Sequence, residues 1–396
     1  MAKKTIRDID VSGKRVLVRV DFNVPLDDQG NITDDTRITA ALPTLKYLLE
    51  HGASLVIMSH LGRPKGQVVE SLRMNPVAAR LSELLGAKVI KMDEVVGDEA
   101  EKASRALKPG EMMLLENLRF DPGETSNEPK FAAALASLGD VYVDDAFGAA
   151  HREHASVVGV AKLLPAVAGF LMENEVSFLQ GLLHNPERPF VAILGGSKIS
   201  DKLKVIGNLQ NLVDTLLIGG GMIFTVMKAD GFYTGNSIVE DDLLEEVGGM
   251  VSESGHKRAT MLLPDDLVVA DEFKAEAQSK VVGADFIPEG WMGLDIGPVT
   301  AGRYSELIAP AKTIFWNGPM GVFEWDKFQD GTRAVARAIA ANAGTKVAGG
   351  GDTIAAIKKY GLEDKFSHIS TGGGASMELL EGKELPGVAV LPDADT

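Results

Sequence analysis

Two sets of side chains in this sequence have the types and the spacing needed to bind anions. The first set lies at or near the ends of apolar runs in the first half of the chain and combines arginines with a histidine and two short polar side chains: Asp21, Asn23, Arg37, His60, Arg63, Arg119 and Arg152. Arginine forms planar, bidentate hydrogen bonds with carboxylates and phosphates. Facing one cleft, these side chains would bind a small acid that carries several negative charges, whereas each arginine taken alone is equally explained by a surface salt bridge.

The second set consists of glycine clusters that end four apolar runs in the second half: FVAILGGSK (190–198), TLLIGGGM (215–222), TKVAGGGD (345–352) and HISTGGGAS (368–376). Glycine lets the backbone turn tightly and approach a ligand closely. A helix that starts directly after such a turn offers free N–H groups to an anion. One cluster alone could be a structural turn, but four of them indicate a phosphate-rich ligand that lies across one edge of a sheet.

Lys198 and Lys202 lie four residues apart around the expected start of a helix. Cations are unfavourable there because the helix macrodipole is positive at its N-terminus. A bound anion would offset that cost, and the alternative is a pair of solvated surface lysines. The segment LGGSKISDKLK (194–204) lacks the G-x-x-x-x-G-K-[ST] spacing, so it is not a Walker A loop.

Asp352 follows the glycines of GGGDTIAAIKKYG (349–361), at the mouth of the next expected helix. Aspartate suits the N-cap of a helix, and a carboxylate beside nucleotide phosphates also suits Mg²⁺. The sequence is compatible with both roles. In FWNGPMGVFEW (315–325) the aromatic side chains are expected in the core, which leaves Asn317 and Glu324 as polar exceptions.

Apolar runs of strand length alternate with helix-like stretches over the whole chain. Such alternation predicts an α/β protein with two doubly wound, Rossmann-like parallel sheets. In an open parallel sheet, ligands bind outside the carboxyl ends of the strands, so each half would carry its own substrate. We expect an N-terminal domain over residues 1–170, a stiff hinge helix over 171–188 and a C-terminal domain over 189–376.

The composition excludes several classes of protein. A net charge of −16 argues against non-specific nucleic-acid binding, so positive charge must be concentrated locally if the ligand is anionic. Without cysteine, the chain can form no disulfide, thiolate metal site or cysteine nucleophile. The N-terminal MAKKTIRDID lacks the apolar core of a signal peptide, and no stretch reaches the roughly 18 apolar residues of a membrane span. We therefore expect a cytoplasmic protein without a membrane segment.

Eight motifs, in order along the chain, resemble those of the phosphoglycerate kinase family: RVDFNVP, SHLGRP, LLENLRF, AHREH, LGGSK, WNGPMGVFEW, GGGDT and STGGGAS. The resemblance covers essentially the full length. It implies a two-lobed, monomeric enzyme whose N-terminal lobe binds 3-phosphoglycerate and whose C-terminal lobe binds MgATP or MgADP. It also implies that the segment 377–396 returns to pack on the N-terminal lobe.

Matched motif by motif, the resemblance assigns the 3-phosphoglycerate contacts to the first set of side chains, and Arg37 also to stabilisation of the transferring phosphoryl group. It places Lys198 near the transfer, Lys202 at the nucleotide phosphates and Asp352 at the Mg²⁺ ion. The remaining nucleotide-binding positions that it implies are Gly195, Gly219, Gly220, Leu294, Asn317, Pro319, Glu324, Gly349, Gly350, Gly351 and Thr353.

The glycines of STGGGAS match the loop that the family uses in the transition state, here Gly372, Gly373 and Gly374. One departure from the family pattern is Ser197, where many members carry alanine. It is a small change that affects none of the assigned roles.

The reaction that the resemblance implies is reversible phosphoryl transfer between the acyl phosphate of 1,3-bisphosphoglycerate and ADP, a step of glycolysis and gluconeogenesis. Its loose transition state needs positioning and charge stabilisation more than covalent help. The acceptor in the reverse direction is a carboxylate, which is ionised at neutral pH and needs no general base. His60 is then a substrate contact. Substrates on separate lobes also require closure, with bending expected near Glu175 and Ser370–Thr371.

Two other classes of protein share this architecture. An NAD-dependent dehydrogenase would carry G-x-G-x-x-G after an early strand and an acidic residue about 20 positions further on, and the sequence has no such pair. A hinged solute-binding protein would need an export signal. It would also have no use for Asp352 beside two lysines.

Overall fold

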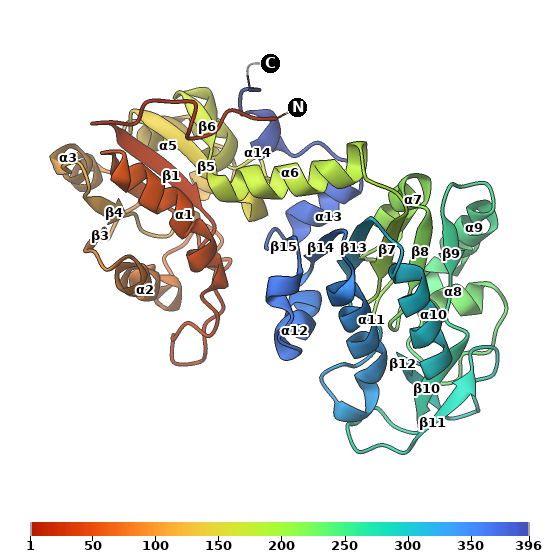
Figure 1. Ribbon diagram of the computed structural model, residues 1–396. Helices are drawn as coiled ribbons and strands as arrows, with labels where there is room; N and C mark the ends of the chain where they lie inside the picture. The colour runs from red at the N-terminus through yellow and green to blue at the C-terminus, as the bar shows by residue number, and fades with distance from the viewer. Residues whose placement is uncertain (1, 395–396) are drawn as a thin grey trace. The chain divides into compact units, whose positions relative to one another are not determined.

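The computed structural model describes residues 2–394 and contains two compact units. Unit 1 comprises the chain up to Ser177 together with the C-terminal segment from Glu384, and unit 2 comprises Phe178–Lys383. The chain first passes from unit 1 to unit 2 within helix α6 (Phe170–His184). Each unit is built around its own six-stranded sheet (Figure 1).

The sheet of unit 1 is wholly parallel, with the strand order β3-β4-β2-β1-β5-β6. At its centre Val18 pairs with Ile57 on one side and Val143 on the other. The central strands are covered on both faces, and they are therefore continuous apolar runs. The strands are β1 (Arg15–Val20), β2 (Ser54–Met58), β3 (Val89–Lys91), β4 (Met112–Leu114), β5 (Val141–Asp145) and β6 (Ala166–Ala168).

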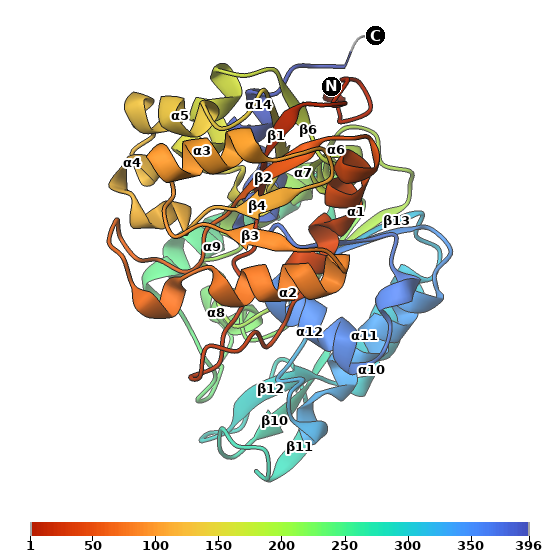
Figure 2. The ribbon, with the colours of Figure 1, turned by 90° about the vertical axis from the view of Figure 1, so that its left-hand side faces the viewer.

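Right-handed crossovers place two helices on each face of this sheet (Figure 2). One face carries α1 (Thr36–Glu50) and α2 (Asn75–Leu85), and the other carries α3 (Asp98–Ala106) and α5 (Pro129–Ala136). Helix α2 has sequence signals at both ends, a proline in its first turn and Gly86 with a φ of 63° as its C-cap.

Two short helices complete unit 1. Helix α4 (Pro122–Thr125) follows the loop after β4, and Asp121 caps it by accepting from the Gly123 N–H. Helix α14 (Pro386–Ala389) belongs to the C-terminal segment, and its Gly387 N–H donates to the Ala150 carbonyl over 2.8 Å. A Cβ at Gly387 would meet Ala150 at 2.8 Å, so this close approach requires glycine.

The main sheet of unit 2 is also parallel, with the strand order β15-β14-β13-β7-β8-β9. Its core includes the fully buried Ile193, Ile314 and Trp316, as expected for the aromatic side chains of FWNGPMGVFEW. The strands are β7 (Phe190–Leu194), β8 (Thr215–Ile218), β9 (Thr260–Leu262), β13 (Thr313–Asn317), β14 (Thr345–Gly349) and β15 (His368–Ser370).

The helices of unit 2 follow from the same crossover rule. The chain leaves β7 towards β8 and β9, and leaves β13 towards β14 and β15, so the order of the sheet switches direction between β7 and β13. One face carries α7 (Leu203–Leu212), α8 (Ile223–Ala229) and α9 (Leu244–Ser254). The other carries α10 (Pro298–Ile308), α11 (Asp330–Ala341) and α12 (Gly351–Lys359), while α13 (Gly374–Leu380) packs against α7.

The predicted pair of doubly wound parallel sheets is confirmed. Unit 2 holds in addition an antiparallel sheet that the prediction missed, with the order β11-β10-β12. Its strands are β10 (Asp266–Ala270), β11 (Ser279–Gly283) and β12 (Met292–Ile296). Within residues 2–394, no helix combines the length and the apolarity of a membrane span.

Candidate active site

Asp21 and Arg37 form an ion pair in unit 1, next to the carboxyl end of β1. Arg37 comes from the first turn of α1, so a strand end and a helix start meet here. Gly148, after β5, packs against the same pair, because a Cβ at Gly148 would overlap the Asp21 carboxylate. Burial opposes ionisation of Asp21, whereas the Arg37 and Arg19 charges and the hydrogen bond from the Asn23 N–H favour it, and the pKa of Asp21 is held below its ordinary value.

His60 is buried at the end of β2, and Arg19 Nη2 lies 3.0 Å from its Nδ1. A guanidinium group can only donate hydrogen bonds, so His60 Nδ1 is the acceptor and the ring proton is on Nε2. Burial, together with the nearby Arg19, Arg119 and Arg37 charges, lowers the pKa of His60 well below its ordinary value, against the opposing effect of Asp21. His60 is therefore a neutral hydrogen-bond donor and a poor proton acceptor.

Arg119 lies beside this cluster, in the 3₁₀ turn Leu118–Phe120 that follows β4. Its Nη1 donates to the Gly62 carbonyl over 3.0 Å, and the Gly62 N–H donates to Asn23 Oδ1 over 2.8 Å. Burial and the Arg19 charge lower the pKa of the Arg119 guanidinium. Among the described residues its buried Nε has no hydrogen-bond partner. A half-buried cation whose buried Nε is an unused donor suits an anionic ligand.

Hydrogen bonds and charge interactions thus bring together five of the seven predicted acid-binding side chains, and these are Asp21, Asn23, Arg37, His60 and Arg119. The other two, Arg63 and Arg152, lie within the SHLGRP and AHREH segments and have exposed side chains.

Sequence reasoning missed Arg19, which is fully buried at the end of β1. Besides His60 it binds Ser156 Oγ, over 2.8 Å, and Ser156 in turn donates to the buried Glu124 over 2.6 Å. Burial, followed by the charges of Arg119 and Arg19, lowers the pKa of the adjoining His154 to about 4. The signal was present, because an arginine interrupts the apolar run VLVRV in a strand that is otherwise buried.

In unit 2 a cavity of about 160 Å³ lies at the carboxyl ends of β7, β13 and β14. This is the point where the strand order switches direction, at which open α/β sheets bind their ligands. The residues that line it are Gly195, Gly196, Ser197, Lys198, Asp201, Lys202, Asn317, Gly318, Gly350, Gly351, Asp352 and Thr353.

Lys202 is the half-buried cation of this cavity and lies directly before α7. Its ammonium group donates to Asn317 Oδ1, while Asn317 Nδ2 donates to the Gly349 carbonyl over 2.8 Å. Asn317, one of the two polar exceptions, therefore joins the ends of β13 and β14 to Lys202. Burial lowers the pKa of Lys202 to about 8, against the opposing charges of Asp201 and Asp352. Lys198 lies on the same cavity with an exposed side chain.

Three glycines after β7 and β8 use their backbone N–H groups within the protein. The N–H of Gly195 donates to the Asn317 carbonyl, that of Gly196 to Pro319 and that of Gly220 to Met320, over 2.9–3.0 Å. A Cβ at Gly220 would lie 2.5 Å from the backbone of Gly196. These glycines lock three loops together, and their N–H groups are not available to a phosphate.

Asp352 lies in the first turn of α12, and Gly350 is the N-cap. The N-cap interpretation of Asp352 is therefore wrong, because the helix begins one residue before it. The Asp352 carboxylate is exposed and lies on the same cavity as Asp201. No cluster of three or more His, Cys, Asp or Glu side chains with metal-binding geometry occurs among residues 2–394. The two carboxylates on the cavity, those of Asp201 and Asp352, fit a Mg²⁺ ion that is held chiefly by phosphates and by one or two carboxylates.

A second residue that sequence reasoning missed is Glu240, in the segment between α8 and α9. Its carboxylate accepts from the Ile199 and Ser200 N–H groups, over 2.7 and 3.0 Å, and from Ser200 Oγ over 2.6 Å. Burial opposes ionisation, but these hydrogen bonds, with the Lys198 charge, hold the pKa of Glu240 below its ordinary value. Glu240 fixes the backbone between Lys198 and Lys202.

Other predicted nucleotide positions lie outside the lining of this cavity. Leu294 is buried in β12, where it clusters with Ala270 of β10 and with Phe328 of the turn Asp326–Phe328, and Glu324 is exposed. Gly219 is buried behind Met320, and Gly349 ends β14.

The hydroxyl of Thr353, on the cavity wall, accepts from the Gly318 N–H over 2.7 Å. After β15, Gly372 N–H donates to Ser370 Oγ, and Gly373 is the N-cap of α13.

One unit thus presents a cluster of arginines with a neutral histidine, and the other presents a lysine-bearing cavity at a sheet switch point. Together they define a two-domain α/β enzyme that binds two anionic substrates, one of them phosphate-rich, as phosphotransferases do.

Comparison with known proteins identifies the family. The family model for phosphoglycerate kinase matches residues 6–383. The phosphoglycerate kinase of Moorella thermoacetica is 58% identical over 99% of this chain and its own full length, and that of Roseiflexus castenholzii is 60% identical over the full length of both. The solved structure of phosphoglycerate kinase from Coxiella burnetii is 40% identical with a TM-score of 0.90, and covers 98% of both chains. The structure from Pyrococcus horikoshii gives 35% and 0.86 over the same share.

The chain belongs to the phosphoglycerate kinase family, and it is a phosphotransferase with a carboxyl group as acceptor. The two other classes, the dehydrogenase and the solute-binding protein, are thereby excluded.

Proposed function

We propose that this enzyme transfers a phosphoryl group reversibly between 1,3-bisphosphoglycerate and ADP, with 3-phosphoglycerate bound by unit 1 and the nucleotide by unit 2. The observation that supports it is the separation of the two anion sites. The arginine cluster suits a small acid with a carboxylate and a phosphate, and the lysine cavity suits a chain of phosphates.

In unit 1, Arg37 and Arg119 bind the acid electrostatically, and the neutral His60 donates from Nε2. Arg63 and Arg152, both exposed, are assigned to the same substrate. The Asp21 carboxylate orients Arg37 through their ion pair. Arg37 is further assigned to the charge that develops on the transferring group, because preorganised donors of this kind are most effective in the transition state.

In unit 2, Lys202 binds nucleotide phosphates and Lys198 stands nearer the transferred group. The bound cofactor is Mg²⁺, as MgATP or MgADP, with Asp352 as its protein ligand. It would neutralise charge on the phosphates. The adenosine is assigned to the surface that includes Leu294, Pro319 and Glu324, and the loop at Gly372 and Gly373 to the transition state.

The chemistry needs no general base. In the reverse direction, a carboxylate oxygen of 3-phosphoglycerate attacks the γ-phosphorus of ATP, the bond from that phosphorus to the β–γ bridging oxygen breaks, and ADP leaves. The carboxylate is already ionised at neutral pH, and the lowered pKa of His60 agrees with a binding role.

We further propose that the enzyme is a cytoplasmic monomer that works by hinge bending, with α6 as the connector. The two substrate sets lie on separate units, and reacting atoms must approach to about 3–3.5 Å.

The test is ADP release from ATP with purified enzyme, Mg²⁺ and 3-phosphoglycerate as acceptor. Glycerate, which lacks the phosphate, and an excess of chelator over Mg²⁺ are the controls. We expect turnover with 3-phosphoglycerate that both controls abolish or strongly reduce. ADP release that does not depend on the acceptor would refute the proposed reaction.

A further inference from the structure

The side chain of Asn117 is fully buried in unit 1 and uses its whole hydrogen-bonding capacity. Its Oδ1 accepts from the Leu61 N–H, over 3.2 Å, and from the Arg119 N–H, over 3.1 Å. Its Nδ2 donates to the carbonyl oxygens of Leu61 and Leu72, over 2.7 and 2.9 Å. A carboxamide has two donor hydrogens and two acceptor lone pairs, so all four are satisfied by backbone groups.

Two of these four bonds hold Leu61, at the centre of the segment 59–63, which we call the 59–63 loop. Leu61, held on both its N–H and its carbonyl, lies directly after His60 and two residues before Arg63. The same amide fixes the backbone N–H of Arg119. Asn117 is uncharged and is not itself a predicted substrate contact. Through the backbone it nevertheless positions three residues that are: His60, Arg63 and Arg119.

Neighbouring side chains also restrict the 59–63 loop, at Gly62. Gly62 has a φ of 63°, and a Cβ there would lie 2.8 Å from the Leu72 side chain. Its N–H and carbonyl are bound by Asn23 Oδ1 and Arg119 Nη1. The loop is therefore clamped between two acid-binding side chains and Asn117.

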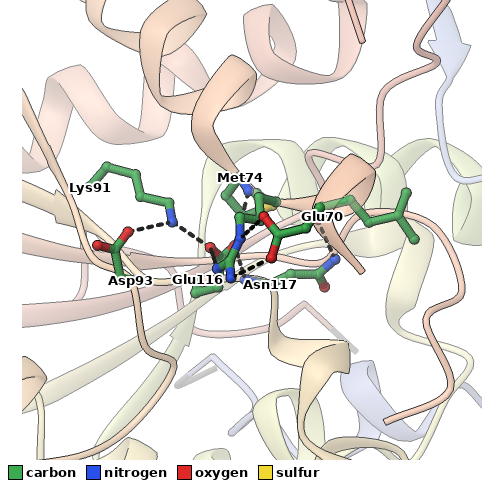
Figure 3. Close-up of polar contacts among 8 residues, drawn as sticks. Glu70, Met74, Lys91, Asp93, Glu116 and Asn117 are labelled. Carbon is green, nitrogen blue, oxygen red and sulfur yellow. Dashed lines mark hydrogen bonds and ion pairs between the residues drawn. The ribbon is translucent and has the colours of Figure 1, made fainter. Parts of the chain in front are cut away.

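Glu116 anchors the backbone on which Asn117 stands (Figure 3). Its buried Oε1 accepts from the Asn117 N–H over 2.8 Å and from the Met74 N–H over 2.9 Å. Its Oε2 forms ion pairs with Lys91 and, over 3.1 Å, with Arg73. Cations from β3 and from the segment before α2 thus hold the carboxylate in place, and this arrangement sets the position of the amide.

We propose that Asn117 is a positioning residue of the acid site, whose four backbone hydrogen bonds hold His60, Arg63 and Arg119 in the geometry that binds 3-phosphoglycerate. The inference rests on the proposed function, which names that substrate. It assigns Asn117 an effect on one substrate only, whereas a merely structural asparagine would change stability and leave both Michaelis constants unchanged.

Asn117→Asp is the matched substitution, because it keeps size and acceptor oxygens but removes both donors and adds charge beside two carbonyl groups. Asn342 provides the control. It is a buried asparagine of unit 2 whose Nδ2 donates to the carbonyls of Ile308, Ala309 and Ala311, over 2.9–3.1 Å. It accepts from the Gly344 N–H over 2.6 Å, and it does not line the cavity. Asn342→Asp therefore removes a similar set of side-chain-to-backbone hydrogen bonds, but in unit 2 and away from the acid site.

We expect Asn117→Asp to raise KM for 3-phosphoglycerate by about tenfold, the factor that corresponds to the net loss of one or two such bonds. KM for ATP should stay within about twofold of the wild type. Asn342→Asp should lower the melting temperature comparably and change neither constant. KM does not depend on how much of a sample is folded, so a reduced yield does not affect the comparison.

Asn117→Ser is the second variant, in case the charged one does not fold. A serine keeps an acceptor for the Arg119 N–H, as at a helix N-cap, but is too short to reach the Leu61 and Leu72 carbonyls. It should also raise KM for 3-phosphoglycerate selectively. Unchanged KM in a folded Asn117 variant, or an equal rise with Asn342→Asp, would overturn the inference. A wild-type enzyme that releases no ADP with 3-phosphoglycerate would instead refute the proposed function.

Discussion

Among single side chains, Arg37 combines a place in the proposed acid site with an exposed fraction of 32% and a fixed partner in Asp21. We predict that Arg37→Ala lowers kcat far more than it raises KM for 3-phosphoglycerate. Its guanidinium is proposed to meet charge that develops only in the transition state, and losing one such donor costs about 2.7–4 kcal/mol. Steady-state kinetics measures this, with Arg63→Ala for comparison, which should act mainly on KM. Full turnover of Arg37→Ala would remove it from the mechanism.

The second prediction at this scale concerns pH. The pKa of Lys202 is lowered to about 8 by burial, so the free enzyme loses this charge as the pH rises from 7 to 9. Nucleotide phosphates favour the charged form and must raise the pKa of Lys202 in the complex. MgADP affinity should therefore fall above pH 8, by up to about tenfold per pH unit.

Titration calorimetry at pH 7, 8 and 9 measures that slope. Lys202→Arg keeps its charge at all three values and should give a flatter profile, even if its affinity is lower at pH 7. Equal slopes for the two proteins would show that another group carries the pH dependence.

Strand-end positions made most of these side chains visible in the sequence, because parallel strands end at one edge of a sheet. Glu240 could not be found in that way, and for Arg19 the sequence shows an arginine within a buried strand but not its partner. Arg19 acts on His60, 41 positions away, and Glu240 on Ser200, 40 positions away. Such pairs depend on how separate loops pack, which local sequence patterns do not encode.

At the scale of elements, the loops after β7, β8 and β13 pack directly on one another, because their glycines let the backbones come into contact. We predict that Gly220→Ala destabilises the enzyme by well over the about 1–2 kcal/mol that a left-handed residue costs by itself. Its φ is 70°, and the new Cβ would lie 2.5 Å from Gly196 backbone atoms. Gly373→Ala is the matched control, since its φ is 53° and no described atom lies within 4 Å of the new Cβ.

Denaturant unfolding of both variants separates steric overlap from backbone strain. Similar losses of unfolding free energy would mean that the loops can move apart at little cost. If Gly373 belongs to the transition-state loop, its variant should in addition lose turnover while it remains folded.

The elements themselves were largely predictable, because buried parallel strands are apolar runs and helices alternate with them. The antiparallel sheet was not. Four of the five residues of β11 are exposed, so it has no apolar run, and β10 pairs with β12 across an intervening segment. The glycine clusters were located correctly, but the sequence could not tell whether a glycine faces a ligand or another loop.

At the scale of the whole molecule, the two proposed substrate sets belong to different compact units, and the chain connects them through α6, where Glu175 is buried. We predict an enzyme that closes fully only with both ligands bound, by bending near Glu175 and at Ser370–Thr371. Closure must bring the reacting atoms to about 3–3.5 Å and exclude water that would hydrolyse the acyl phosphate. Solution X-ray scattering on the free enzyme, on each binary complex and on a non-reacting ternary complex would measure it. The radius of gyration should decrease mainly in the ternary complex. A value that stays unchanged there, with both sites saturated, would argue against hinge bending and would require the transfer geometry to exist already in the free enzyme.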